Sequence, residues 1–122
     1  MSRAELLDLL TERSYSNQEV TLASGKKSNF YIDCRQTSLS GRGHRLIGVA
    51  LLEAIERCEE QNGVPFDAIA GMTLGGDPLV SAVSLTASLK GRELPALIVR
   101  KEAKEHGAGR QVEGDLKLPP NL

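Results

Sequence analysis

The stretch DAIAGMTLGGDPLVSAVSLTASLKGRELPALIV, residues 67–99, decides the fold of this chain. It begins with a short apolar run over residues 67–71, of the kind that forms a buried strand. A glycine-rich turn follows, then an apolar pattern with helical spacing that stops at Lys90, and then a second apolar run over residues 95–99. Strand, turn, helix and strand in this order form a βαβ unit with two parallel strands. The sequence therefore predicts an α/β fold.

Two loops leave this unit at the carboxyl ends of its strands, which is where ligands bind in open parallel sheets. The first loop holds Gly75 and Gly76, followed by Asp77 and Pro78 at a helix start. Backbone N–H groups there can hold an anion. The carboxylate of Asp77 repels phosphate unless a metal ion or water lies between, so helix capping by Asp77 is an equal alternative. Neither GxGxxG nor GxxxxGK[ST] occurs, so no motif supports a dinucleotide fold or a P-loop.

The second loop, RKEAKEHGAGR over residues 100–110, follows the second strand directly. Arginine and lysine suit phosphate oxygens, and histidine exchanges a proton near neutral pH. A solvated charged turn is the plain alternative for such a run. Because both loops leave from the same edge of the sheet, we expect them to face one anion-binding crevice.

The residues before this unit predict two helices and a hairpin. The helices span residues 3–13 and 41–62, and Ser40 caps the second helix. The hairpin pairs a strand around residues 20–22 with a strand over residues 29–34. Three of the four aromatic residues lie in or beside it, together with two lysines at its tip: Tyr15, Phe30, Tyr31, Lys26 and Lys27. We favour a local core for these rings, with a stacking surface for a flat anionic ligand as the alternative.

Length, composition, charge and cysteine spacing exclude several classes of protein. The 122 residues suit one domain, and 40% hydrophobic with 25% charged residues is the composition of a folded chain. A net charge of -1 argues against a general nucleic-acid binder. The longest apolar run, residues 47–52, is too short to cross a membrane. Cys34 and Cys58 show no metal-ligand spacing, so without a signal peptide we expect reduced thiols and a cytoplasmic protein.

The run RKEAKEHG, residues 100–107, resembles the loop of the orotate phosphoribosyltransferases, which are type I phosphoribosyltransferases. Residues 22–31, LASGKKSNFY, are similar to the hood hairpin of that family, and residues 69–99 to its first core strand, helix and strand. The likeness runs from about Glu12 to Asp115. It implies transfer of ribose 5-phosphate from phosphoribosyl pyrophosphate (PRPP) to orotate, which gives orotidine 5'-monophosphate and pyrophosphate in the de novo synthesis of UMP.

The resemblance also implies the residues of the site. The catalytic residues would be Lys101, Lys104 and His106. The PRPP contacts would be Arg100, Lys101, Lys104, His106, Gly75 and Gly76, and the orotate contacts Lys27, Phe30, Tyr31 and, as a second choice, Lys26. Mg²⁺ is the implied cofactor, without metal ligands from the protein. The implied partner is a second copy, in a homodimer whose 100–110 loop acts in trans, and no nucleic acid or membrane is expected.

The chain departs from the family pattern at two places. Lysines that are common in the family are replaced at Ala23 and in the turn at Gly75 to Pro78. The paired acidic residues and the Thr/Gly-rich loop that cradle ribose 5-phosphate do not occur. We therefore expect one C-terminally truncated domain with impaired activity and an uncovered apolar face on the βαβ unit. Its parts would be the N-terminal helix and hood hairpin (1–40), the core part (41–115) and an atypical tail (116–122). A non-catalytic anion-binding or dimerisation module is the alternative.

Overall fold

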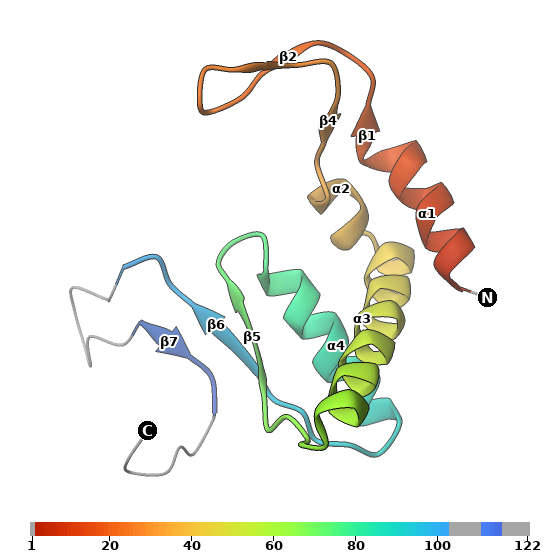
Figure 1. Ribbon diagram of the computed structural model, residues 1–122, viewed down its shortest axis with the longest axis vertical. Helices are drawn as coiled ribbons and strands as arrows, with labels where there is room; N and C mark the ends of the chain where they lie inside the picture. Colours follow the sequence, from red (N-terminus) through yellow and green to blue (C-terminus); the bar gives the residue numbers. More distant parts are fainter. Residues whose placement is uncertain (1, 103–110, 116–122) are drawn as a thin grey trace.

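The computed structural model describes residues 2–102 and 111–115, and it consists of an N-terminal helix and a projecting arm on an α/β body (Figure 1). The four helices of this part of the chain are α1 (Ser2–Arg13), α2 (Arg35–Ser38), α3 (Gly41–Asn62) and α4 (Asp77–Leu89). Its strands are β1 (Tyr15–Ser16), β2 (Val20–Thr21), β3 (Lys27–Ser28), β4 (Tyr31–Ile32), β5 (Ile69–Met72), β6 (Ala96–Val99) and β7 (Val112–Glu113).

The body is built on the predicted βαβ unit. Strands β5 and β6 are parallel, with Ile69 opposite Ala96 and Met72 opposite Val99. Helix α4 connects them and packs against both. Strand β7 adds an antiparallel edge to β6, so the sheet order is β5-β6-β7. The parallel pair confirms the prediction, whereas β7 was not predicted, because two residues are too few for a periodic pattern.

The core lies where α3 packs against α4, and its innermost side chains are at most 2% exposed: Leu52, Val83, Ala87 and Leu94. Both ends of α3 are where the sequence predicts them. The hydroxyl of Ser40 accepts a hydrogen bond from the Gly43 N–H at 3.0 Å, and Gly63 ends the helix with a left-handed φ of 71°. The long helix is therefore defined by local signals that the sequence shows.

An ion pair ties the end of α3 to the segment before β6. The two terminal nitrogens of Arg92 donate to the two carboxylate oxygens of Glu59 at 2.8 and 2.6 Å, and the Phe66 N–H donates to the same carboxylate at 2.6 Å. The hydrogen bonds from Arg92 and then from Phe66 lower the pKa of Glu59 from its ordinary value of 4.5. The pair and the Phe66 hydrogen bond together join the end of α3, the segment that follows it and the segment before β6.

We predict that Glu59→Gln flattens the acid side of the stability profile. A carboxyl whose pKa is lower in the folded state stabilises the fold above its unfolded pKa, and the contribution is lost as pH falls through the folded pKa. Urea unfolding at a series of pH values between neutral and about 3 measures this loss. Glu60→Gln, at an exposed position one residue along, is the control. A wild-type slope below pH 4.5 that survives in Glu59→Gln would contradict the assignment.

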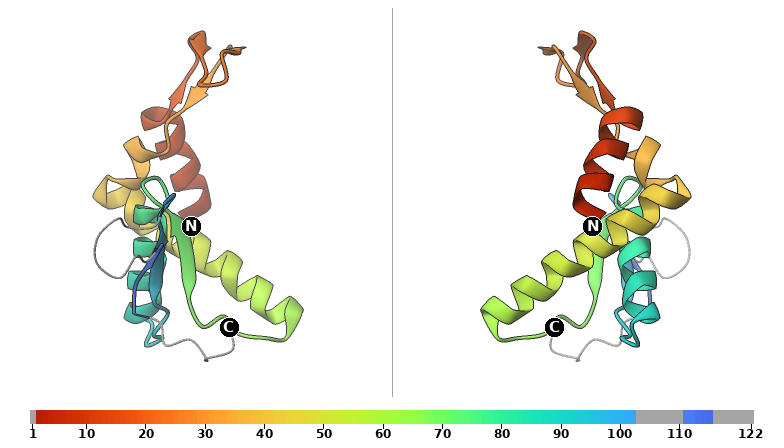
Figure 2. Two further views of the ribbon diagram at one scale, coloured as in Figure 1. Left: turned by 90° about the vertical axis from the view of Figure 1, so that its left-hand side faces the viewer. Right: turned by 90° about the vertical axis from the view of Figure 1, so that its right-hand side faces the viewer.

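The arm, residues 15–32, projects from the body in every view (Figure 2). Strand β1 pairs with β4 and β2 with β3, both antiparallel, which confirms a hairpin. The predicted pairing of residues 20–22 with 29–34 is wrong, because residues 20–21 pair with 27–28 and residues 31–32 pair with 15–16. The strands are shorter than predicted, and Lys27 lies in β3 and not in the turn. The turn closes through a hydrogen bond from the Leu22 N–H to the Lys26 carbonyl at 2.8 Å. Gly25 holds a left-handed φ of 85° in this turn.

The predicted local core of the arm is wrong. Tyr15, Phe30 and Tyr31 are 45%, 51% and 42% exposed. The rings of Tyr15 and Phe30 stack on each other with centroids 6.3 Å apart, but no second layer of the described chain covers them. The physical reason is the projection of the arm, which leaves its residues too far from the body to be buried. The alternative, an aromatic stacking surface, fits the exposure of all three rings.

The base of the arm is held by a small polar core. The hydroxyl groups of Ser14 and Thr37 are 2.6 Å apart and buried, and the Asp33 N–H donates to the Ser14 carbonyl at 2.9 Å. Thr37 belongs to α2, a four-residue helix that was not predicted because it is too short for a helical period. These bonds fix the start of α2 relative to α1 and the arm.

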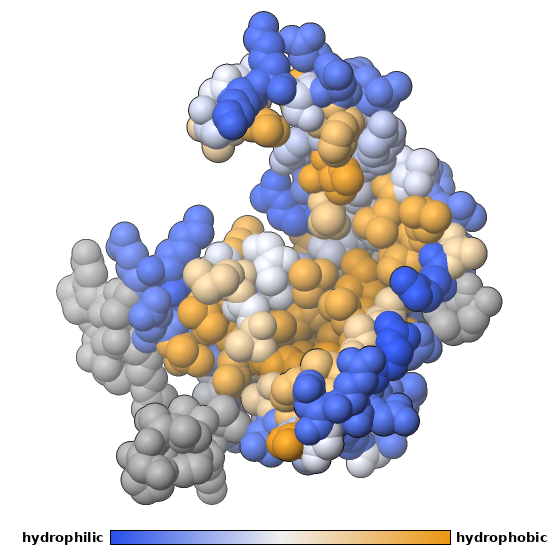
Figure 3. Space-filling model, in the orientation of Figure 1, coloured by the Kyte–Doolittle hydropathy of each residue, from blue (hydrophilic) through white to orange (hydrophobic). Residues whose placement is uncertain are grey.

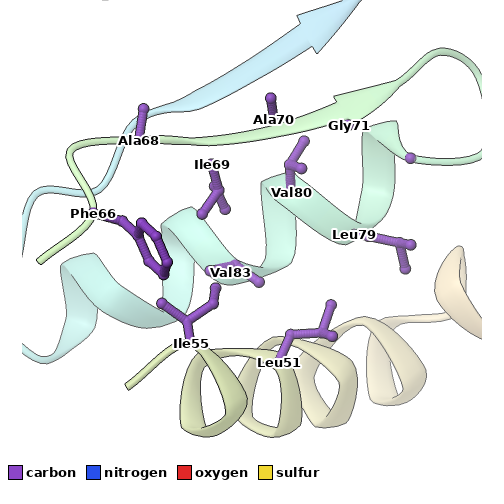
Figure 4. Close-up of a pocket in the computed structure, with 11 residues that line it drawn as sticks. Leu51, Ile55, Phe66, Ala68, Ile69, Ala70, Gly71, Leu79, Val80 and Val83 are labelled. Carbon is purple, nitrogen blue, oxygen red and sulfur yellow. The ribbon is translucent and has the colours of Figure 1, made fainter. Parts of the chain in front are cut away.

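The described part of the body has an apolar hollow beside β5. A hollow of about 400 Å³ lies between α3, α4 and β5, and the side chains of Leu51, Ile55, Phe66 and Val83 converge in it (Figure 4). Every residue that lines it is apolar or glycine. The hollow therefore has no group that can do chemistry, and we place the functional site elsewhere.

Candidate functional site

The 73–76 turn, which connects β5 to α4, has two backbone N–H groups without an acceptor among the described residues. The turn is closed by hydrogen bonds from the Gly76 N–H to the Met72 carbonyl at 2.8 Å and from the Asp77 N–H to the Leu74 carbonyl at 3.2 Å. The N–H groups of Leu74 and Gly75 donate to nothing within the ranges that the structure describes. Consecutive free N–H groups in a turn form an anion-binding concavity.

The two glycines of this turn are present for different reasons. A Cβ on Gly76 would lie 2.7 Å from the Met72 carbonyl oxygen, so packing against β5 requires glycine there. A Cβ on Gly75 would meet nothing within 4 Å, and the φ of Gly75 is not positive. Neither packing nor backbone conformation explains Gly75. A Cβ at position 75 would lie in open space, in the turn whose Leu74 and Gly75 N–H groups have no acceptor in the described residues.

Asp77 does not cap α4, which corrects that alternative. Gly76 occupies the cap position, Asp77 is the first helical residue, and no side-chain cap bond forms. Asp77 Oδ2 accepts a hydrogen bond from the Thr73 hydroxyl at 3.1 Å across the turn. Its other oxygen, Oδ1, is buried and has no partner among the described residues. The carboxylate therefore braces the turn and keeps one acceptor unused.

Arg100 begins the 100–110 loop and is tied to the residues that follow the loop. Its N–H donates to the Gln111 carbonyl at 2.7 Å, and its Nε donates to Glu113 Oε1 at 3.1 Å. Lys101 is exposed. These bonds hold the two ends of the loop together at the carboxyl end of β6. Lys104 and His106 lie outside the described residues, so their roles stay predictions.

The arm overhangs the edge of the sheet where these groups lie. Figure 1 shows the arm bending over the carboxyl ends of β5 and β6, and Figure 3 shows an open recess between the arm and the body. Of the predicted orotate contacts on the arm, Lys26, Phe30 and Tyr31 are exposed, and Lys27 makes only an exposed ion pair with Glu19 at 3.6 Å. The structure thus brings the arm, the 73–76 turn and the described start of the 100–110 loop to one side of the molecule.

One cation at this recess was missed by sequence reasoning. Arg35 follows the arm and lines a second hollow, of about 360 Å³, between α2 and the 73–76 turn. Its Nε donates to Asp33 Oδ1 at 3.1 Å. Hydrogen bonds from Gln36 and then Arg35 lower the pKa of Asp33, and Asp33 in turn raises the pKa of Arg35. A lone arginine beside an aspartate carries no motif, so only the fold reveals its position.

The sequence was compared with those of known proteins. No family model matches it. The orotate phosphoribosyltransferase of Sorangium cellulosum is 51% identical over 123 residues, which cover 98% of this chain and 60% of that protein. That of Corynebacterium glutamicum is 44% identical and covers 93% of this chain and 56% of that protein. Over nearly its whole length this chain is similar to orotate phosphoribosyltransferases. It spans less than two thirds of the length of these relatives.

Solved structures of orotate phosphoribosyltransferases show the same similarity. The Mycobacterium tuberculosis protein in complex with Fe(III) dicitrate has a TM-score of 0.74 and 34% identity, and the match covers 95% of this chain and 61% of that one. The same protein in complex with PRPP has a TM-score of 0.68 and 30% identity. These matches confirm the predicted α/β fold of a type I phosphoribosyltransferase. The division into parts 1–40, 41–115 and 116–122 stays a prediction, and residues 116–122 lie outside the described part.

Proposed function

We propose that this protein transfers ribose 5-phosphate from PRPP to orotate, in the cytoplasm and as a step of UMP synthesis. The products are orotidine 5'-monophosphate and pyrophosphate. The observation that carries the proposal is the recess, where free N–H groups of the 73–76 turn, the cations at the end of β6 and the exposed aromatic arm lie on one side of the sheet. No helix among the described residues is long and apolar enough to cross a bilayer.

The chemistry explains why these groups are needed. A ring nitrogen of orotate forms a bond to C1 of the ribose while the bond from C1 to the pyrophosphate oxygen breaks, and the nitrogen loses its proton. The pyrophosphate leaves with the bonding electrons, so N–H donors and cations at its oxygens stabilise the transition state. In the proposal Arg100, Lys101, Gly75 and Gly76 contact the phosphates. Lys104 and His106 join them from the same loop.

The arm supplies the base-binding part of the proposed site. Phe30 and Tyr31 present exposed rings to stack on a pyrimidine, and Lys26 and Lys27 add positive charge near this anionic ligand. Closing the arm and the 100–110 loop over the substrates would exclude water, which would otherwise attack the same carbon. We further propose a homodimer in which the 100–110 loop reaches the partner's site. A mass measurement in solution tests that arrangement.

Mg²⁺ is the cofactor that the family resemblance implies. The described residues contain no cluster of three His, Cys, Asp or Glu side chains that would form a cage. Mg²⁺ is commonly held by one or two carboxylates together with substrate phosphates. Asp77 meets that need, because its buried Oδ1 has no partner in the described ranges. We propose that PRPP carries most of the Mg²⁺ ligands and that Asp77 holds the ion directly or through water. The bound ion would neutralise phosphate charge.

We predict that Gly75→Ala weakens PRPP binding roughly tenfold, because a methyl group over the free N–H groups blocks access and costs about one charge-assisted hydrogen bond. Calorimetric titration with PRPP and Mg²⁺ measures the effect. Gly41→Ala is the matched control, since its Cβ also meets nothing within 4 Å but lies at the start of α3. Equal PRPP affinity for both variants would remove Gly75 from the site.

A measurement of product formation distinguishes the proposed transferase from a non-catalytic module. A non-catalytic anion-binding or dimerisation module would bind PRPP without forming orotidine 5'-monophosphate from orotate. The formation of that product by the purified protein, followed by the loss of orotate absorbance, is the direct test.

A further inference from the structure

The side chain of Arg35 is held in place by Asp33, but only part of its guanidinium forms hydrogen bonds with described residues. Asp33 fixes the guanidinium through Nε at 3.1 Å, and Asp33 is itself fixed by the Arg35 N–H at 3.2 Å and by the Gln36 amide at 3.1 Å. The two terminal nitrogens of Arg35 have no acceptor in the part of the chain that the structure describes. A planar guanidinium held in this way presents a fork that matches a carboxylate.

The hollow beside Arg35 is lined mainly by apolar side chains, together with two polar residues, Asp77 and Ser81. Its other lining residues come from the end of α2, the 73–76 turn, α4 and β6: Leu39, which directly follows α2, Leu74, Asp77, Pro78, Ser81 and Ile98. Leu39 and Leu74 are 70% and 67% exposed, so large apolar side chains face the open hollow. A ligand that covers them gains free energy from their removal from water.

The residues that line this hollow favour orotate over PRPP as its ligand. A pyrophosphate group has no apolar surface. Contact with leucine, proline and isoleucine side chains would remove its hydration without replacing those hydrogen bonds, which costs free energy. A pyrimidine ring that carries one carboxylate has flat apolar faces for these side chains and an anionic edge for the guanidinium. The free N–H groups of Leu74 and Gly75 already offer the phosphates a polar site in the adjoining turn.

We propose that Arg35 recognises the carboxylate of orotate and makes the site selective for orotate over uracil, which lacks that group. This inference rests on the proposed function and adds a specificity residue to it. The Arg35 hollow holds the ring edge at the base of the arm, while the exposed aromatic rings of the arm cover its face.

Calorimetric titrations of the whole chain with orotate, uracil and PRPP in separate experiments test this role. Arg35→Gln should weaken orotate binding roughly tenfold to a hundredfold, the range for loss of a charged hydrogen-bond pair, and leave uracil and PRPP within about twofold. Arg35→Lys keeps the charge but not the fork, so it should recover part of the orotate affinity and part of the preference over uracil. Arg57→Gln, at an exposed arginine near the far end of α3, is the charge control.

Three outcomes decide the matter. Wild-type orotate affinity in Arg35→Gln, with PRPP binding intact, overturns the specificity role but leaves the proposed function standing. A parallel loss of orotate and PRPP affinity also overturns it, because Arg35 would then hold the phosphates or the fold. A wild-type chain that binds neither orotate nor PRPP overturns the proposed function and this inference together.

Discussion

Replacing Lys101 with alanine is expected to slow orotidine 5'-monophosphate formation roughly a hundredfold to a thousandfold, as loss of one preorganised donor in a transition state does. Lys101 directly follows Arg100, whose bonds to Gln111 and Glu113 fix the start of the loop at the carboxyl end of β6. Lys101 itself is exposed. In the proposed reaction, its positive charge would meet the leaving pyrophosphate, whose negative charge rises as the bond to ribose breaks.

The experiment compares initial rates and PRPP dissociation constants for wild-type protein, Lys101→Ala and Lys90→Ala. Lys90 is an exposed lysine at the end of α4, near the amino end of β6 and so at the opposite edge of the sheet. Its loss changes the net charge by the same amount without touching the site. We expect Lys101→Ala to reduce the rate more than PRPP affinity, because the interaction strengthens in the transition state. Rates within about twofold for both variants would exclude Lys101 from the chemistry.

The parts of the fold that the sequence predicts are those with local signals. The parallel pair β5 and β6 comes from two short apolar runs on either side of a helical pattern, and α3 is bounded by Ser40 and Gly63 through their capping geometry. Helix α2 and strand β7 have four and two residues, so neither is long enough to show a period. Their positions depend on tertiary contacts, such as the hydroxyl pair of Ser14 and Thr37.

The residues of the candidate site also divide into those that local sequence signals indicate and those that only the fold reveals. The sequence indicates Gly75, Gly76 and Arg100 because they follow strands of a βαβ unit, and the structure places all three at that edge. The prediction that Phe30 and Tyr31 are buried in a local core was wrong, because composition does not show whether a hairpin packs on the body or projects from it. Arg35 was missed because its importance comes from the hollow beside it, to which α2, α4 and β6 all contribute.

The free energy of unfolding is expected to fall by about 1–3 kcal/mol in Gly48→Ala, the range for overpacking a close-packed contact. Gly48 is buried where α3 meets α4. A Cβ there would lie 2.6 Å from the Ala82 carbonyl oxygen and closer still to the Thr86 hydroxyl oxygen. That hydroxyl already donates to the same carbonyl at 2.7 Å. Since the carbonyl is backbone, the new methyl group can be accommodated only if the two helices move apart.

The sign of the change in unfolding free energy shows whether packing or helix propensity dominates at position 48. Alanine favours a helix over glycine by about 1 kcal/mol, so propensity alone would make Gly48→Ala stabilising. Gly41, in the same helix, has open space at its Cβ, and Gly41→Ala should leave stability unchanged or raise it by up to about 1 kcal/mol. Urea unfolding of both variants gives the comparison. Gly48→Val should lose more than Gly48→Ala, because its added methyl groups enlarge the collision. Stabilisation by Gly48→Ala would mean that α3 and α4 do not pack as closely as the Ala82 carbonyl distance requires.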